Sequence, residues 1–176
     1  MDSRAATEQL TIAFDNYFAM SDILRDDLIA ALNVEDESPA WRRNFLRTTV
    51  VLVEGHTHCL REICLVGLAC NPPEISDKET RALRSEKEFS AIDRFKYTLR
   101  ATYKIFALQP TPDFGDIHWA RATMALRKRD SLIHPKYPTD LEIPAELWSE
   151  IHAGITWLMK QLFNFTALLQ EKYLSA

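Results

Sequence analysis

The chemistry that this chain of 176 residues could perform is concentrated in residues 127–136, where acid–base and phosphate-pairing side chains are densest. A histidine can take the proton of an RNA 2′-hydroxyl, and an arginine can hold the phosphate while charge builds in the transition state. His134 and Arg129 are the candidates for these two roles. Asp130 could orient the imidazole, and Ser131 could donate a hydrogen bond to phosphate. The stretch therefore suits phosphodiester cleavage that needs no metal and no cofactor.

A proline fixes where this stretch lies on its helix. Pro135 has no N–H and disfavours the α conformation at His134, so a helix running in from Gly115 should end at Ile133 or His134. The partial negative charge of that helix end, and the carboxylate of Asp130, would both favour a protonated imidazole. We therefore expect His134 at a helix C-terminus.

Two arginines compete for the role of phosphate ligand. At roughly 100° per residue, Arg129 and His134 lie about 140° apart on an ideal helix. They converge only if the helix end swings the histidine, or if a second chain completes the site. Arg127 and His134 are nearly in line, which makes Arg127 the geometrically easier partner. Lys136 and Arg47 are further candidates for contact with RNA phosphates.

Arg129, four intervening residues and His134 form an R-x4-H spacing, with a polar residue directly after the arginine. This pattern resembles the signature of the HEPN superfamily, small all-helical domains many of which are metal-independent ribonucleases. The resemblance implies RNA as substrate and a homodimer with its motif helices near the two-fold axis. It is also compatible with a toxin or defence effector held by an antitoxin-like protein partner.

The same residues also suit roles without catalysis. A basic last turn stabilises a helix end, an Asp–Arg pair is common on surfaces, and a histidine before a proline is common in turns. The chain would then be a helical module that interacts with proteins or binds a nucleotide phosphate. A metalloprotein is disfavoured, because His56 and His58 point to different faces of one helix. The three cysteines, at positions 59, 64 and 70, form no C-x2-C pair and are expected to be reduced thiols.

Amphipathic runs predict the helices that position this stretch. Ser38 followed by Pro39 is a strong helix start, and this helix should run to Cys70, before the prolines at 72 and 73. Its polar stripe comprises Arg43, Arg47, Glu54, His58, Arg61 and Glu62. If the helix packs beside the one that ends at His134, Glu54 could support the site. The alternative is an exposed polar seam with no function.

The remaining runs complete an all-α fold. Residues 5–32 predict one helix, or two joined near Ser21 as an N-cap. A short turn should follow Ser76, with Glu79 in a capping box, and longer helices should span 85–108 and 144–174. The flank of the 85–108 helix, facing solvent or RNA, carries Lys96, Arg100 and Lys104. Together these predict a single domain over residues 1–176, an antiparallel bundle of four long helices plus short ones.

Composition bounds the remaining alternatives. Apolar residues make up 47% and charged residues 26%, as in ordinary globular proteins. The net charge of −4 argues against a broad nucleic-acid platform but leaves room for a local basic patch. The sequence predicts no signal peptide and no apolar run long enough to cross a bilayer, so we expect a cytoplasmic protein without membrane contact. The absence of a Gly-rich phosphate loop and of G-x-S-x-G disfavours P-loop, Rossmann and hydrolase classes.

Overall fold

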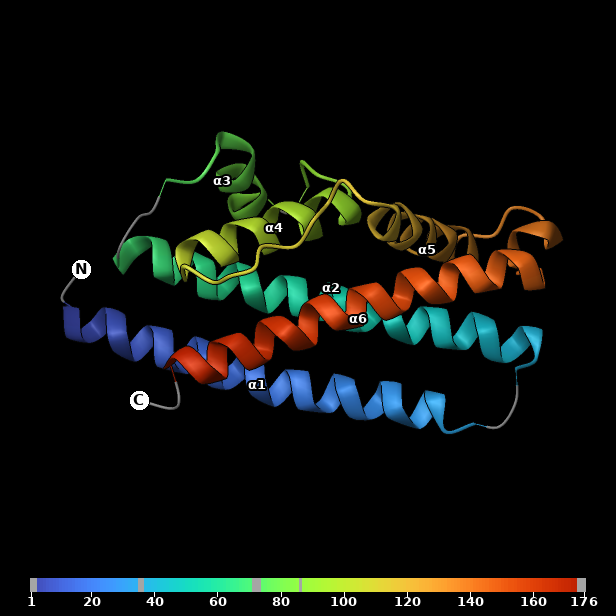
Figure 1. Cartoon of the computed structure of the whole chain (residues 1–176), viewed down its shortest axis with the longest axis horizontal. Helices are drawn as coiled ribbons and strands as arrows, with labels where there is room; N and C mark the ends of the chain where they lie inside the picture. The colour runs from blue at the N-terminus through green and yellow to red at the C-terminus, as the bar shows by residue number, and fades with distance from the viewer. Residues whose placement is uncertain (1–2, 35–36, 71–73, 86, 174–176) are drawn as a thin grey trace. The chain divides into compact units, whose positions relative to one another are not determined.

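The computed structural model describes residues 3–34, 37–70, 74–85 and 87–173, with side chains from residue 5 to 172 within these ranges except that of Cys70 (Figure 1). Over these ranges the chain forms helices and no strand, which confirms the all-α prediction. The elements are α1 (Ser3–Leu32), α2 (Pro39–Cys70), α3 (Asp77–Arg84), α4 (Ala91–Ile105), α5 (Ile117–Ile133), a 3-10 helix η1 (Pro138–Leu141) and α6 (Ala145–Tyr173). None of the described helices is both long and apolar enough to cross a membrane.

Local capping signals set the start of α2 and the course of α1. α2 begins at Pro39, as predicted, with the N–H of Trp41 donating to Ser38 Oγ at 3.2 Å. Its predicted stop at residues 71–73 lies outside the described residues. α1 is one continuous helix, which is the first of the two predicted alternatives; Ser21 is buried inside it and does not cap a second helix.

α4 is shorter than the predicted helix over 85–108. The hydroxyl of Ser85 accepts the N–H of Glu88 at 3.2 Å, before α4 begins. Ser90 then caps α4, its hydroxyl accepting the N–H of Asp93 at 3.1 Å. Both serines carry the N-cap signal, and the sequence alone favoured the first of them.

The chain divides into two compact units. The first comprises Met1–Ile23 and Val53–Pro112, and the second comprises Leu24–Leu52 and Asp113–Ala176. α1 and α2 each contribute one part to each unit. The first unit adds α3 and α4, and the second adds α5, η1 and α6.

In the first unit, a buried carboxylate joins α3 to α4, which lie side by side (Figure 1). Glu79 Oε2 accepts the Ser76 N–H at 2.7 Å and lies 2.8 Å from Lys104 Nζ, while Oε1 lies 3.5 Å from Arg100 Nε. Burial raises the pKa of Glu79, but the hydrogen bonds from Lys104 and Ser76 outweigh it, so the net shift is downward. The predicted basic flank of α4 therefore supplies the partners of this carboxylate.

Two polar residues of α2 are buried in the first unit. Arg61, predicted on the polar stripe, is only 5% exposed because its guanidinium donates to the carbonyl of Leu83, near the end of α3. His56 is fully buried, with Nδ1 3.2 Å from the hydroxyl of Tyr17. Burial lowers the pKa of His56 to about 4, so its imidazole is neutral near pH 7.

In the second unit, α5 packs along α6, and a glycine allows the close approach (Figure 1). A Cβ on Gly154 would lie 2.4 Å from the carbonyl carbon and oxygen of Arg121 and 2.6 Å from the nitrogen of Ala122. Arg121 also forms an ion pair across the two helices, with Nε 2.6 Å from Glu150 Oε2. The position of α5 therefore requires that residue 154 of α6 is a glycine.

Candidate functional site

α5 ends where the proline predicts. Ile133 is its last residue and His134 is the C-cap, with φ −121° and ψ 57°. The backbone N–H of His134 still donates to the carbonyl of Asp130 at 3.0 Å. Its imidazole is exposed at the helix end. The predicted placement of this histidine at a helix C-terminus is confirmed.

Arginines of α2 hold the backbone at this end of the second unit. Arg47 Nη2 donates to the carbonyl of Leu132 at 3.0 Å, and its Nη1 donates to Asn44 Oδ1 at 3.2 Å. A guanidinium there complements the partial negative charge of the last carbonyls of α5. Arg42 and Arg43 donate in the same way to the carbonyls at 143 and 141. Arg47, predicted as a phosphate contact, is therefore a cap for the helix that carries His134.

An aspartate that the sequence analysis did not single out organises the turn after the helix. Asp140 Oδ2 accepts the N–H groups of Lys136 and Tyr137 at 2.8 and 2.9 Å. The hydrogen bond from Lys136, and next that from Tyr137, lower the pKa of Asp140. The carbonyl of Asp140 accepts Lys128 Nζ at 3.0 Å, which ties the turn back to α5. The signal for this residue in the sequence is an acidic side chain at the third position of a turn that begins with Pro138, where it can accept the N–H groups at the start of the turn.

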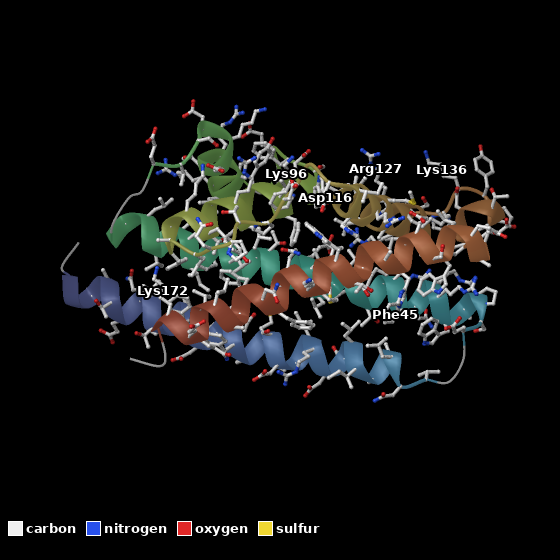
Figure 2. The ribbon with its side chains drawn as sticks, viewed as in Figure 1. Phe45, Lys96, Asp116, Arg127, Lys136 and Lys172 are labelled. Carbon is white, nitrogen blue, oxygen red and sulfur yellow. The ribbon has the colours of Figure 1, made fainter. Side chains whose placement is uncertain are left out.

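The charged residues of the motif differ in exposure. Arg129 Nη1 lies 3.2 Å from Asp130 Oδ1, and their side chains are 20% and 66% exposed. Ser131 is half-buried, whereas Arg127 and Lys136 are exposed. Figure 2 shows Arg127 and Lys136 extending away from the ribbon on the same side. These two cations are thus placed for contact with a ligand, while Arg129 is held by its neighbour.

The structure gathers most of the predicted site residues into the second unit. They are Arg47 on α2, Arg127, Arg129, Asp130 and Ser131 on α5, and His134 and Lys136 just after it. Glu54, predicted as a supporting residue, is half-buried on α2 in the first unit and is not part of this group. Within the described residues, no three His, Cys, Asp or Glu side chains are grouped so that they could hold a metal ion.

The arrangement offers an exposed imidazole for proton transfer and cationic side chains for phosphate. Comparison with protein-family models, with curated proteins and with solved structures finds no match to this chain. The likeness to HEPN proteins therefore rests on the residues around Arg129 and His134.

Proposed function

We propose that the chain is a metal-independent endoribonuclease of the HEPN type, with its site at the C-terminal end of α5. His134 is the general acid–base residue, and Arg129 binds the scissile phosphate. Arg127 and Lys136 contact the flanking phosphates. The observation that supports this best is the exposed imidazole of His134 at a helix end capped by Arg47, within a run of cationic side chains.

The reaction needs a proton to be moved twice. The imidazole of His134 takes the proton of a 2′-hydroxyl, the 2′-oxygen bonds to phosphorus, and the bond to the 5′-oxygen breaks. A protonated imidazole then supplies the proton that the leaving 5′-oxygen requires. The products are a 2′,3′-cyclic phosphate and a free 5′-hydroxyl, and no oxidant, reductant or metal enters the balance.

Arg129 and Asp130 act as a pair in this proposal. The carboxylate, 3.2 Å from the guanidinium, limits the conformations of Arg129, and the remaining 20% exposure leaves that side chain within reach of phosphate. A positioned guanidinium loses less conformational entropy when it forms two parallel bonds to phosphate oxygens. The Asp130 carboxylate itself is mostly exposed and can also hydrogen-bond an imidazolium.

A second copy of the chain belongs to the proposal. A single imidazole can act either as the base or as the acid at a given moment, depending on its protonation. Two copies of His134 that face each other would supply a base and an acid together. Arg129 and His134 leave an ideal helix about 140° apart, so a phosphate held between two copies could meet the arginine of one and the histidine of the other. The proposed enzyme is therefore a homodimer.

The alternative is a helical module without catalysis that binds a nucleotide phosphate or a protein. It is favoured by the hydrogen bonds and the ion pair that the polar side chains of the site form within the protein. Arg47 caps α5, Lys128 holds the carbonyl of Asp140, and Arg129 is paired with Asp130. Under this alternative only Arg127, His134 and Lys136 would serve a ligand.

The deciding experiment is cleavage of defined RNAs in EDTA, with cyclic-phosphate ends as the readout. We expect His134→Ala to lose about 100-fold or more in rate, the usual size of a general acid–base contribution. Arg129→Ala should lose about as much, the usual cost of removing a donor that stabilises transition-state charge. His118→Ala is the matched control, because His118 is an exposed histidine at the other end of α5. Helix content is checked by circular dichroism. Equal cleavage by wild type and all variants would reject the ribonuclease, and absence of cleavage by wild type would favour the alternative.

A further inference from the structure

A surface cavity of about 410 Å³ lies in the second unit, between the part of α1 and the part of α2 that belong to this unit. It is lined by Leu24 and Asp27 of α1 and by Arg47, Thr48 and Val51 of α2. Its volume falls within the range of about 300–1,000 Å³ typical of small-molecule sites. The lining combines one carboxylate, one guanidinium, one hydroxyl and two aliphatic side chains.

The cavity adjoins the candidate catalytic end of α5 through one shared residue. Arg47 lines the cavity, and its Nη2 also donates to the carbonyl of Leu132, two residues before His134. All of these groups belong to the second unit. A ligand in the cavity would therefore contact the arginine that caps the helix end carrying the imidazole.

We propose that this cavity is a nucleobase subsite selective for guanine, which holds one guanosine of an RNA against Arg47, the residue that caps the helix end of His134. The inference rests on the proposed ribonuclease function and adds its base specificity. Single-stranded RNA is read by bases that leave the stack and present their Watson–Crick edges to side chains. Asp27, which is exposed at the cavity, is the reading group.

The carboxylate of Asp27 selects among bases by its two acceptor oxygens. An ionised carboxylate accepts hydrogen bonds and donates none. Guanine presents two adjacent donors, N1–H and the N2 amino group, which match both oxygens at once. Adenine and cytosine each present one amino donor beside a ring-nitrogen acceptor, and uracil presents one N–H between two carbonyls. Only guanine forms the paired contact without bringing an acceptor against the carboxylate.

The rest of the lining fits a purine. Arg47 has five N–H donors, of which the bonds to Leu132 and Asn44 use two, so it can also donate to the carbonyl oxygen of guanine. Leu24 and Val51 offer apolar contact to the faces of the ring, and Val51 is 54% exposed. Covering such an aliphatic side chain with a base removes apolar surface from water.

Binding of guanosine 3′-monophosphate tests the subsite without requiring cleavage. We expect the protein to bind this nucleotide about tenfold or more tightly than the adenosine, cytidine and uridine 3′-monophosphates. Asp27→Asn should abolish the preference, because an amide replaces one acceptor by a donor. Asp26→Asn is the matched control, because Asp26 is the neighbour of Asp27 in the chain and does not line the cavity. Its carboxylate lies 3.5 Å from the guanidinium of Arg25. Equal binding of the four nucleotides by wild type, or an unchanged preference in Asp27→Asn, would overturn the subsite.

Cleavage of RNAs that vary at one position separates this inference from the proposed function. We expect wild type and Asp26→Asn to cut beside guanosine, and Asp27→Asn to cut without that preference. Selective binding of guanosine 3′-monophosphate that is lost in Asp27→Asn, with no cleavage by wild type, would support the subsite and reject the ribonuclease. Cleavage that depends on His134 but shows no preference for guanosine would support the ribonuclease and overturn the subsite.

Discussion

Replacing Gly154 by alanine tests whether the close approach of α5 and α6 is needed. The added methyl group would lie 2.4 Å from the carbonyl carbon and oxygen of Arg121 and 2.6 Å from the nitrogen of Ala122. Ordinary contacts of a Cβ lie at 3.4–4 Å, so α5 would have to move by about 1 Å. The atoms in the way belong to the backbone and cannot rotate aside.

Two opposing effects set the size of the change. Alanine is better than glycine in a helix interior by about 1 kcal/mol, which favours the variant. Overpacking a filled contact typically costs about 1–3 kcal/mol, and a backbone clash belongs at the upper end of that range. We therefore expect the free energy of unfolding of Gly154→Ala to fall by about 2 kcal/mol. For a chain of this size that corresponds to a decrease in Tm of about 4–8 °C.

Thermal and urea unfolding, followed by far-UV circular dichroism, measure this change. Asn164→Ala is the matched control, because Asn164 is exposed on the same helix and its substitution should raise the free energy of unfolding by about 0.5 kcal/mol. If Gly154→Ala is as stable as wild type or more stable, the helix–helix contact is not tight and the reasoning is wrong. Under the proposed function, the same variant should also reduce RNA cleavage, since a shift of about 1 Å at a catalytic group can cost about 100-fold.

Two further predictions concern the first unit. Burial lowers the pKa of His56 from its usual 6.5 to about 4. Between pH 6.5 and pH 4 the unfolded chain therefore binds more protons than the folded chain. As the pH falls through this range, the free energy of unfolding should decrease by up to about 3 kcal/mol. Urea unfolding at pH 7 and pH 4.5 should show a smaller fall for His56→Gln than for wild type; an equal fall would contradict the assignment. Ala107, just after α4, has φ 46°, where glycine avoids the strain of a side chain, so Ala107→Gly should raise the free energy of unfolding by up to about 1 kcal/mol. Ala30→Gly is the control: Ala30 is exposed within α1, and its replacement should lower the free energy of unfolding by about 1 kcal/mol in the same assay. If Ala107→Gly also lowers the free energy of unfolding, the argument is refuted.

The features that could be predicted from the sequence depend on residues within about four positions of one another. The serine–proline pair at 38 and 39 marks the start of α2, and Pro135 marks the end of α5. The capping box of Ser76 and Glu79 is present as expected, with both reciprocal bonds. In each case the groups that satisfy the helix end are neighbours in the chain, so no tertiary information is needed.

The features that could not be predicted join residues far apart in the chain. The same Glu79 that caps α3 also meets Lys104, 25 positions later. Arg61 has the spacing of a solvent-facing residue on α2, yet it is buried because the carbonyl of Leu83 lies within reach of its guanidinium. Gly154 carries no local signal at all, since its role depends on the backbone of another helix. Periodicity tells which face of a helix is apolar, and it cannot tell which polar residues find a distant partner.

The same limit applies to the candidate site. A run of cations near a helix end predicts affinity for phosphate, but cations there can instead hold backbone carbonyls. Arg47 and Lys128 do the latter, through the carbonyls of Leu132 and Asp140. Arg127 and Lys136 extend into solvent. Loss of activity on replacing Arg47 would therefore be expected to come with loss of stability, because the end of α5 would lose its cap. Loss of activity at Arg127 with stability unchanged would report contact with the ligand itself.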